Sequence, residues 1–185
     1  MLTRFNDWLL ARSSGRSVLL TLAAFLVMFG IFGLVLGPAF QATSGGLRPI
    51  DMSPDKSVDA MYAQFAHYTD ASRVVYRWFF LLDFIYPPTL ALLFATFWAW
   101  LARRNRWHFP QRWTGRGLLL VPFVAAILDW TENLGFLALI EALPAQHRGL
   151  ALFTGTTNYV KLAILAACML TTILFAIGAL ARRRR

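Results

Sequence analysis

The sequence predicts an all-α integral membrane protein, a single-domain bundle of four transmembrane helices over residues 1–185. First, 58% of the 185 residues are hydrophobic and the mean hydropathy is +0.54, which is too apolar for a soluble domain of this size. Second, a helix needs about 20 residues to cross a bilayer core of roughly 30 Å, and four apolar stretches are at least this long. Third, arginines gather at the ends of these stretches, where the topology of membrane proteins is encoded.

The four expected spans are residues 17–40, 74–102, 117–140 and 150–180. The first carries no charged residue and is longer than the about 7–15 apolar residues of a signal peptide, so we interpret it as a true span. Within it, Gly33 and Gly37 form a G-x-x-x-G pair, a pattern that permits two helices to approach closely. A homo-oligomer through this helix is therefore one expected partner, beside the membrane lipid itself.

The charged residues predict the orientation of the spans. The N-terminal segment, the second connection and the C-terminal tail are strongly basic, whereas the first connection mixes acids with bases. When the chain crosses the membrane four times, the three basic clusters and both termini lie on the same side. The positive-inside rule assigns this side to the cytoplasm. The excess of arginine over lysine is typical of a GC-rich bacterial genome, so a bacterial inner membrane is expected. The basic clusters are Arg4, Arg12 and Arg16; Arg103, Arg104, Arg106, Arg112 and Arg116; and Arg182 to Arg185.

Several function classes do not fit the sequence. The formal net charge is +9, but no basic groove interleaved with aromatic residues occurs, so nucleic acid is not an expected partner. The one cysteine, Cys168, lies inside an apolar stretch, and the three histidines are scattered along the chain. We therefore expect no metal site and no cofactor.

The first connection, residues 41–73, is the largest segment outside the expected spans. From Ser57 onward, Val58, Met61, Tyr62 and Phe65 recur at helical spacing. This pattern predicts a short amphipathic helix on the outer membrane surface, which either covers an opening beneath it or caps the bundle.

Ionisable residues inside three of the spans are the strongest functional signal. Asp83, Asp129, Glu132 and Lys161 each cost about 2.5–3.5 kcal/mol to insert, and such residues usually have a function. Counted from the outer helix ends at about 1.5 Å per residue, all four fall in one layer roughly 10–17 Å below the outer surface. The spacing also places polar side chains on one face of each helix. These faces carry Asp129, Glu132 and Asn133 on the third helix, and Thr154, Asn158 and Lys161 on the fourth.

On the second helix, Asp83 shares a face with Tyr86, and Pro87 and Pro88 follow directly. The prolines are expected to kink this helix below Asp83 and to free backbone carbonyls there. The layer then holds three carboxylates and one ammonium. Protonation or a bound cation must remove this surplus of negative charge. A neutral carboxylic acid beside an ionised one suits acid–base chemistry, a cationic ligand or a proton path.

The segments LLDFIYPPTLALL, AAILDWTENLGFLALIE and TTNYVK resemble the EXPERA group, which includes the sterol Δ8–Δ7 isomerase (emopamil-binding protein) and the sigma-2 receptor. The resemblance spans about residues 17–180. It implies acids that bind a cationic amphiphile or move a proton on a sterol ring. By this resemblance Asp83 is the second-span acid, Asp129 and Glu132 are the third-span acids, and Asn158 is the fourth-span asparagine, whereas Lys161 departs from the pattern.

Three functions remain open on these grounds. The first is a binder of, or an isomerase-type enzyme acting on, an isoprenoid-, sterol- or lipid-like small molecule. The second is a small proton- or cation-coupled transporter or channel, and the third is a structural partner protein in which the polar layer only joins the helices. For the first, the catalytic candidates are Glu132, Asp129 and Asp83, and the ligand-binding candidates are Lys161, Asn133, Asn158, Tyr86, Trp130 and Thr154.

Overall fold

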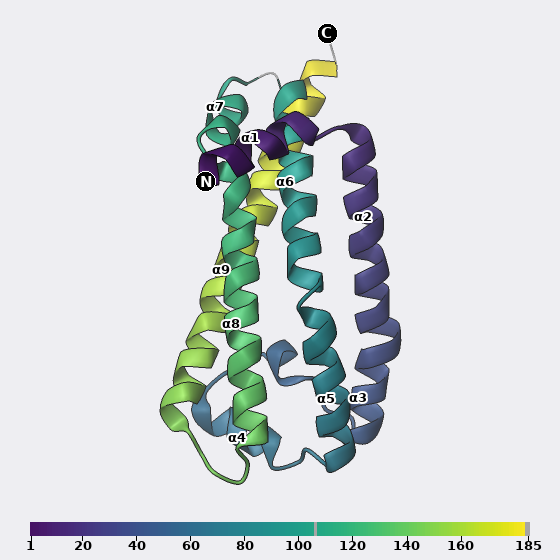
Figure 1. Ribbon diagram of the computed structural model, residues 1–185, viewed down its shortest axis with the longest axis vertical. Helices are drawn as coiled ribbons and strands as arrows, with labels where there is room; N and C mark the ends of the chain where they lie inside the picture. Colours follow the sequence, from purple (N-terminus) through teal and green to yellow (C-terminus); the bar gives the residue numbers. More distant parts are fainter. Residues whose placement is uncertain (106, 184–185) are drawn as a thin grey trace. The chain divides into compact units, whose positions relative to one another are not determined.

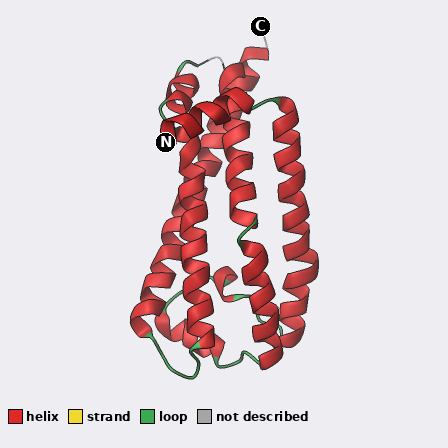
Figure 2. Cartoon of the chain, in the orientation of Figure 1, coloured by secondary structure: helices red, strands yellow, loops and turns green. Residues whose placement is uncertain are grey.

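The computed structural model describes residues 1–105 and 107–183, which are mostly helical and contain no strand (Figure 2). Four of its helical stretches are long and apolar enough to cross a membrane. They are Gly15–Thr43, Asp70–Arg104, Leu118–Glu141 and Arg148–Ala181. The predicted all-α fold with four candidate spans is thus confirmed, and every expected boundary lies within four residues of the observed one.

The chain divides into two compact units. Unit 1 comprises Met1–Leu26, Pro88–Ala126 and Leu162–Arg185, and unit 2 comprises Val27–Pro87 and Ile127–Lys161. Nothing in the composition marks a boundary between them.

The first span consists of α2 (Gly15–Gly30), a π-helical stretch η1 (Ile31–Leu36) and α3 (Gly37–Thr43) (Figure 1). The wider π-helical turns come directly before Pro38, which has no N–H to donate to the preceding turn. A Cβ atom at Gly37 would lie 3.0 Å from the carbonyl oxygen of Phe32, so this position leaves little room for a side chain.

The second span is broken. Helix α5 (Asp70–Asp83) ends at the acid, and α6 (Tyr86–Arg104) begins three residues later. Pro87 and Pro88 therefore lie in the first turn of a new helix, where a missing N–H costs nothing. The expected kink is a full helix break located just before the prolines, and it makes Asp83 the last residue of a helix.

The connecting segment 44–69 contains a short 3-10 turn, η2 (Ile50–Met52), and the predicted helix, α4 (Val58–Phe65). Ser57 caps α4 by accepting a hydrogen bond from the Ala60 N–H at 3.3 Å. Met61, Phe65 and Ile50 are at most 1% exposed, because they pack into the core of unit 2. The apolar face of α4 is thus occupied by contacts with the protein.

The remaining elements are α1 (Leu2–Arg12), α7 (Phe109–Gly115), η3 (Leu118–Leu120), α8 (Val121–Glu141) and α9 (Arg148–Arg183). In unit 1, α1 contacts α7, and Asn6 Nδ2 donates to the Thr114 carbonyl oxygen at 3.0 Å. Trp98 on α6 is 1% exposed and donates from Nε1 to Thr172 Oγ1 on α9 at 2.8 Å.

Candidate functional site

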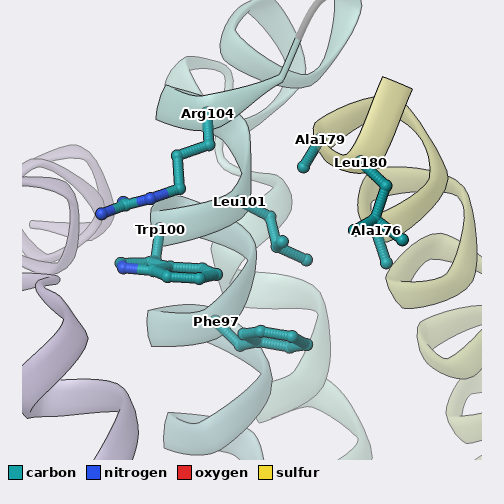
Figure 3. A pocket seen from close by; sticks show the side chains of 7 residues that line it. All are labelled: Phe97, Trp100, Leu101, Arg104, Ala176, Ala179 and Leu180. Atoms are coloured by element: carbon teal, nitrogen blue, oxygen red, sulfur yellow. The ribbon is translucent and has the colours of Figure 1, made fainter. Parts of the chain in front are cut away.

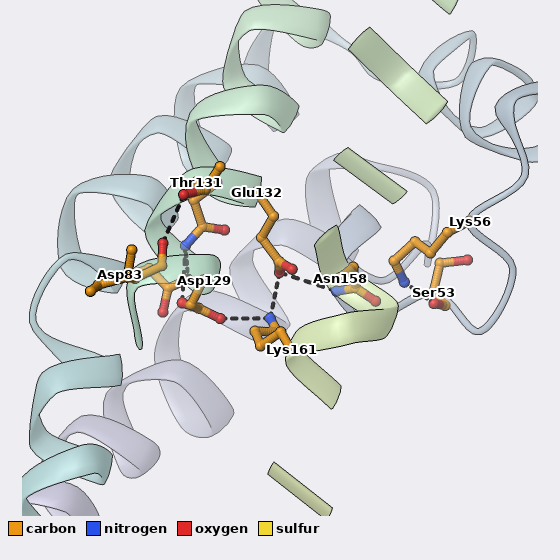
Figure 4. A network of polar contacts seen from close by, with 10 residues as sticks. Ser53, Lys56, Asp83, Asp129, Thr131, Glu132, Asn158 and Lys161 are labelled. Carbon is orange, nitrogen blue, oxygen red and sulfur yellow. Dashed lines mark hydrogen bonds and ion pairs between the residues drawn. The ribbon is translucent and has the colours of Figure 1, made fainter. Parts of the chain in front are cut away.

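The predicted polar layer forms a continuous network inside unit 2, built from α5, α8 and α9 (Figure 4). Lys161 on α9 is at its centre. Its Nζ atom lies 2.6 Å from Asp129 Oδ1 and also donates to Glu132 Oε1. Because Asp129 and Glu132 are three residues apart on α8, one ammonium reaches both.

Two asparagines extend the network. Asn133 Nδ2 donates to Asp83 Oδ2 at 2.5 Å and to Asp129 Oδ2 at 3.2 Å, and so joins α5 to α8. Asn158 Nδ2 donates to Glu132 Oε1 at 3.1 Å. The sequence-predicted acids, the lysine and both asparagines are therefore brought together.

Glycines allow α9 to approach its neighbours closely in this region. A Cβ atom at Gly135 on α8 would lie 2.2 Å from Thr154 Oγ1, and one at Gly155 would lie 2.7 Å from the Lys56 carbonyl oxygen. A side chain at Gly155 would displace the backbone of Lys56, and one at Gly135 would displace the side chain of Thr154. Packing this tight aligns Lys161 with the acids of α8.

Asp51 belongs to the site, although the sequence reasoning placed it in the outer loop. The turn η2 inserts it beside Asp83, and together with Tyr76 and Asn133 these acids line a small cavity. The cavity volume is about 10 Å³, which is room for roughly one water molecule. Phe79 and Phe80 complete the lining.

The environment of Asp51 favours its neutral form. Burial raises the pKa of Asp51, and the positive charge of Lys161 opposes this increase. Its Oδ1 atom is buried without a hydrogen-bond partner among the described residues. The only signal in the sequence is weak: Asp51 stands between the apolar residues Ile50 and Met52.

Lys56 is the second residue that the sequence reasoning missed. Its side chain donates to the Ser53 carbonyl oxygen, and its backbone N–H donates to Tyr159 Oη on α9 at 3.2 Å. Lys56 is only 4% exposed, and this burial lowers the pKa of its ammonium against the opposing attraction of Asp51 and Glu132. These contacts attach the connecting segment 44–69 to α9.

The charges in the assembled site do not balance. It contains four carboxyl groups, on Asp51, Asp83, Asp129 and Glu132, against the ammonium groups of Lys56 and Lys161. Within residues 1–105 and 107–183, only Asp129 and Glu132 of the four lie at ion-pair distance from a cation. Two carboxyl groups, Asp51 and Asp83, therefore share the cavity without a bonded cation.

Three predicted ligand contacts lie around this network. Trp130 donates from Nε1 to the Phe84 carbonyl oxygen at 3.1 Å and stacks on the Phe84 ring at a centroid distance of 5.9 Å. Tyr86 is half-buried, and its ring lies 5.3 Å from that of Phe32. Thr154 is fully buried against Gly135. The ligand roles of these three residues stay predictions.

The described part of the chain contains no group of three or more His, Cys, Asp or Glu side chains arranged to hold a metal ion. Comparison with known proteins gave no match to a family model, to a curated protein or to a solved structure. The resemblance to the EXPERA group therefore stays a prediction.

Proposed function

We propose that this chain is an integral protein of a bacterial inner membrane, with both termini cytoplasmic, that binds a hydrophobic small molecule carrying one cationic centre. Four helices of sufficient length and hydropathy support the membrane location. The alternation of basic and mixed connections supports the orientation. In this orientation the connecting segment 44–69 lies on the outer side, with α4 at the membrane surface.

The observation that carries the proposal is the shared cavity of Asp51 and Asp83. A buried carboxyl group without a bonded cation either keeps its proton or attracts a positive charge. The cavity wall suits a cation, because Tyr76, Phe79 and Phe80 can present aromatic faces to it. A protonated amine is the matching ligand group.

The size of the cavity limits what can enter. Room for about one water admits the charged centre of a ligand but not its hydrocarbon body. An aromatic row starts at the cavity wall with Phe80, which lies 5.0 Å from Phe84 between ring centroids, and continues through Phe84 to Trp130. Phe84 is 38% exposed, so an isoprenoid-, sterol- or lipid-like body can lie along this row. This arrangement agrees with the resemblance to the EXPERA group.

The same site supports acid–base chemistry. With a double bond of the bound molecule at the mouth of the cavity, the protonated carboxyl group of Asp83 would donate its proton to one carbon of that bond. The resulting carboxylate would then remove a proton from the adjacent carbon of the cation, which shifts the double bond and restores the acid, as isomerisation requires. Asp129 and Glu132, which lie at ion-pair distance from Lys161, would place carboxyl oxygens close enough to stabilise a positive intermediate near them. Catalysis of this type is the enzymatic form of the proposal.

A structural role of the polar layer is the competing proposal, and the small cavity favours it. Interhelical hydrogen bonds such as Asn133 to Asp83 join α5 to α8 regardless of any ligand. In this case a ligand site would not exist, and each polar residue would contribute only to stability.

Mass spectrometry of the small molecules that copurify with the protein separates these proposals. Wild type is compared with Asp83→Asn, Asp51→Asn and Glu132→Gln. The matched control is Asp59→Asn, since Asp59 is exposed and pairs with Arg148 at 2.8 Å on the surface. A discrete compound retained by wild type and by the control, but lost from Asp83→Asn and Asp51→Asn, supports the binding site. Identical lipid profiles in all variants, with only thermal stability lowered, support the structural role.

A further inference from the structure

An apolar groove lies in unit 1 between α6 and α9, on residues that the acidic cavity does not use (Figure 3). Its volume is about 480 Å³, within the roughly 300–1,000 Å³ of small-molecule sites. Phe97 and Leu101 point from α6 toward α9, where the small side chains of Ala176 and Ala179 leave the space open.

A single arginine lies at the edge of this groove, with its guanidinium beside Trp100 and directed away from Ala176 and Leu180 (Figure 3). The guanidinium carbon of Arg104 lies 4.1 Å from the centre of the Trp100 ring, and Trp100 stacks on Phe97 at 5.9 Å between ring centroids. Stacking holds the guanidinium in place but uses none of its N–H donors. In the described part of the chain no carboxylate lies at ion-pair distance from Arg104, so these donors can bind an external anion.

The groove lies at one end of two candidate spans. Arg104 is the last residue of the second candidate span, and Leu180 in the groove lining precedes the last residue of the fourth. Arginine at a span end is at the level of lipid phosphates, while the apolar groove below it faces acyl chains. Unit 1 carries further arginines, including Arg12, Arg16 and Arg112, which attract anionic lipid to this side.

We propose that this groove binds one anionic phospholipid. An acyl chain lies along Phe97, Leu101 and Ala176, and the phosphate accepts hydrogen bonds from the Arg104 guanidinium. Charge complementarity selects an anionic head group. A zwitterionic lipid carries its own positive group, which the arginines of unit 1 would repel. The proposal does not depend on the acidic cavity, since the two sites share no residue.

Native mass spectrometry tests the proposed lipid site. The full-length protein is measured from mixed micelles that contain phosphatidylglycerol and phosphatidylcholine with the same acyl chains. Wild type is expected to retain one phosphatidylglycerol molecule. Arg104→Gln is expected to lose this preference by about tenfold, the equivalent of one charge-assisted hydrogen bond. Ala176→Phe fills the groove and should lose the lipid while Arg104 is unchanged.

The matched control is Arg112→Gln, which removes the same charge from an exposed position outside the groove. Retention of phosphatidylglycerol by this control, with loss in Arg104→Gln, supports the site. Equal loss in both variants means that only the overall charge matters and overturns it. Equal binding of both lipids by wild type, or a dimer mass in place of bound lipid, also overturns it.

Discussion

Lys161 on α9 and Asp129 on α8 form an ion pair with 2.6 Å between Nζ and Oδ1, and their side chains are only 10% and 14% exposed. The same ammonium donates to Glu132, whose side chain is fully buried. Two carboxyl groups therefore depend on one cation for their charge compensation. This dependence makes Lys161 the residue whose loss should disturb unit 2 most.

We expect Lys161→Met to destabilise the protein by about 3–5 kcal/mol, the usual cost of leaving buried charge uncompensated. Adding Glu132→Gln should recover part of the loss, because only one of the two acids then lacks its cation. Thermal unfolding in detergent measures both effects. Arg148→Met is the control, since the exposed pair of Arg148 with Asp59 contributes at most about 1 kcal/mol. Equal losses of thermal stability in Lys161→Met and Arg148→Met would contradict the buried network.

Asp51 should make the stability of the protein fall as the pH rises. Burial raises its pKa in the fold above the ordinary value of 3.8, so above that pH the unfolded chain releases a proton that the folded chain keeps. The stabilisation is complete below pH 3.8 and is lost as the pH rises through the folded pKa. The melting temperature of wild type relative to Asp51→Asn should therefore decrease from about pH 4 upward.

Asp55 provides the opposite control. The Ser57 backbone N–H donates to Asp55 Oδ1 at 2.8 Å, and this bond lowers the pKa of Asp55. Wild type relative to Asp55→Asn should gain stability as the pH rises toward 3.8, and then stay constant. Identical pH profiles for the two comparisons would show that Asp51 is not buried in its neutral form.

Gly155→Ala should detach the connecting segment 44–69 from α9. The added methyl would lie 2.7 Å from the Lys56 carbonyl oxygen, a backbone atom that moves only with its segment. We expect a loss of about 1–3 kcal/mol and faster limited proteolysis of residues 44–69. Gly149→Ala is the matched control, because nothing lies within 4 Å of its Cβ position on the same helix. It should be neutral or slightly stabilising.

The proposed orientation predicts which positions a membrane-impermeant maleimide can label in intact cells. With Cys168 replaced by serine, Pro54→Cys should react from outside, because Pro54 is exposed in the connecting segment. Arg112→Cys should react only after the membrane is permeabilised. Labelling of Arg112→Cys in intact cells would contradict the proposed orientation. If Pro54→Cys reacts neither in intact nor in permeabilised cells, Pro54 lies within the membrane.

Hydropathy and helical spacing alone determined a large part of this protein. Long, mostly apolar stretches have few alternatives to a transmembrane helix, which is why the eight expected ends of the four candidate spans lie within four residues of the observed ones. Spacings of three and four residues place side chains on one face of a helix regardless of its neighbours. The contact of Asn133 with Asp129 within α8 followed from that rule. The contacts of Asn158 and Lys161 with the acids of α8 also needed the packing of α9 against α8.

Tertiary structure alone decided how the connecting segment completes the site. Asp51 lies more than 30 residues before Asp83 in a polar, proline-containing stretch, and no local pattern indicates that η2 folds inward. The burial of Ile50 in the core of unit 2 fixes the position of Asp51. By contrast, the break of the second span at Phe84 follows from local sequence, because Pro87 and Pro88 have no N–H to donate to the carbonyls of Asp83 and Phe84 four residues earlier. Local sequence encodes the period of a helix, whereas long-range packing selects which loop residues are buried beside it.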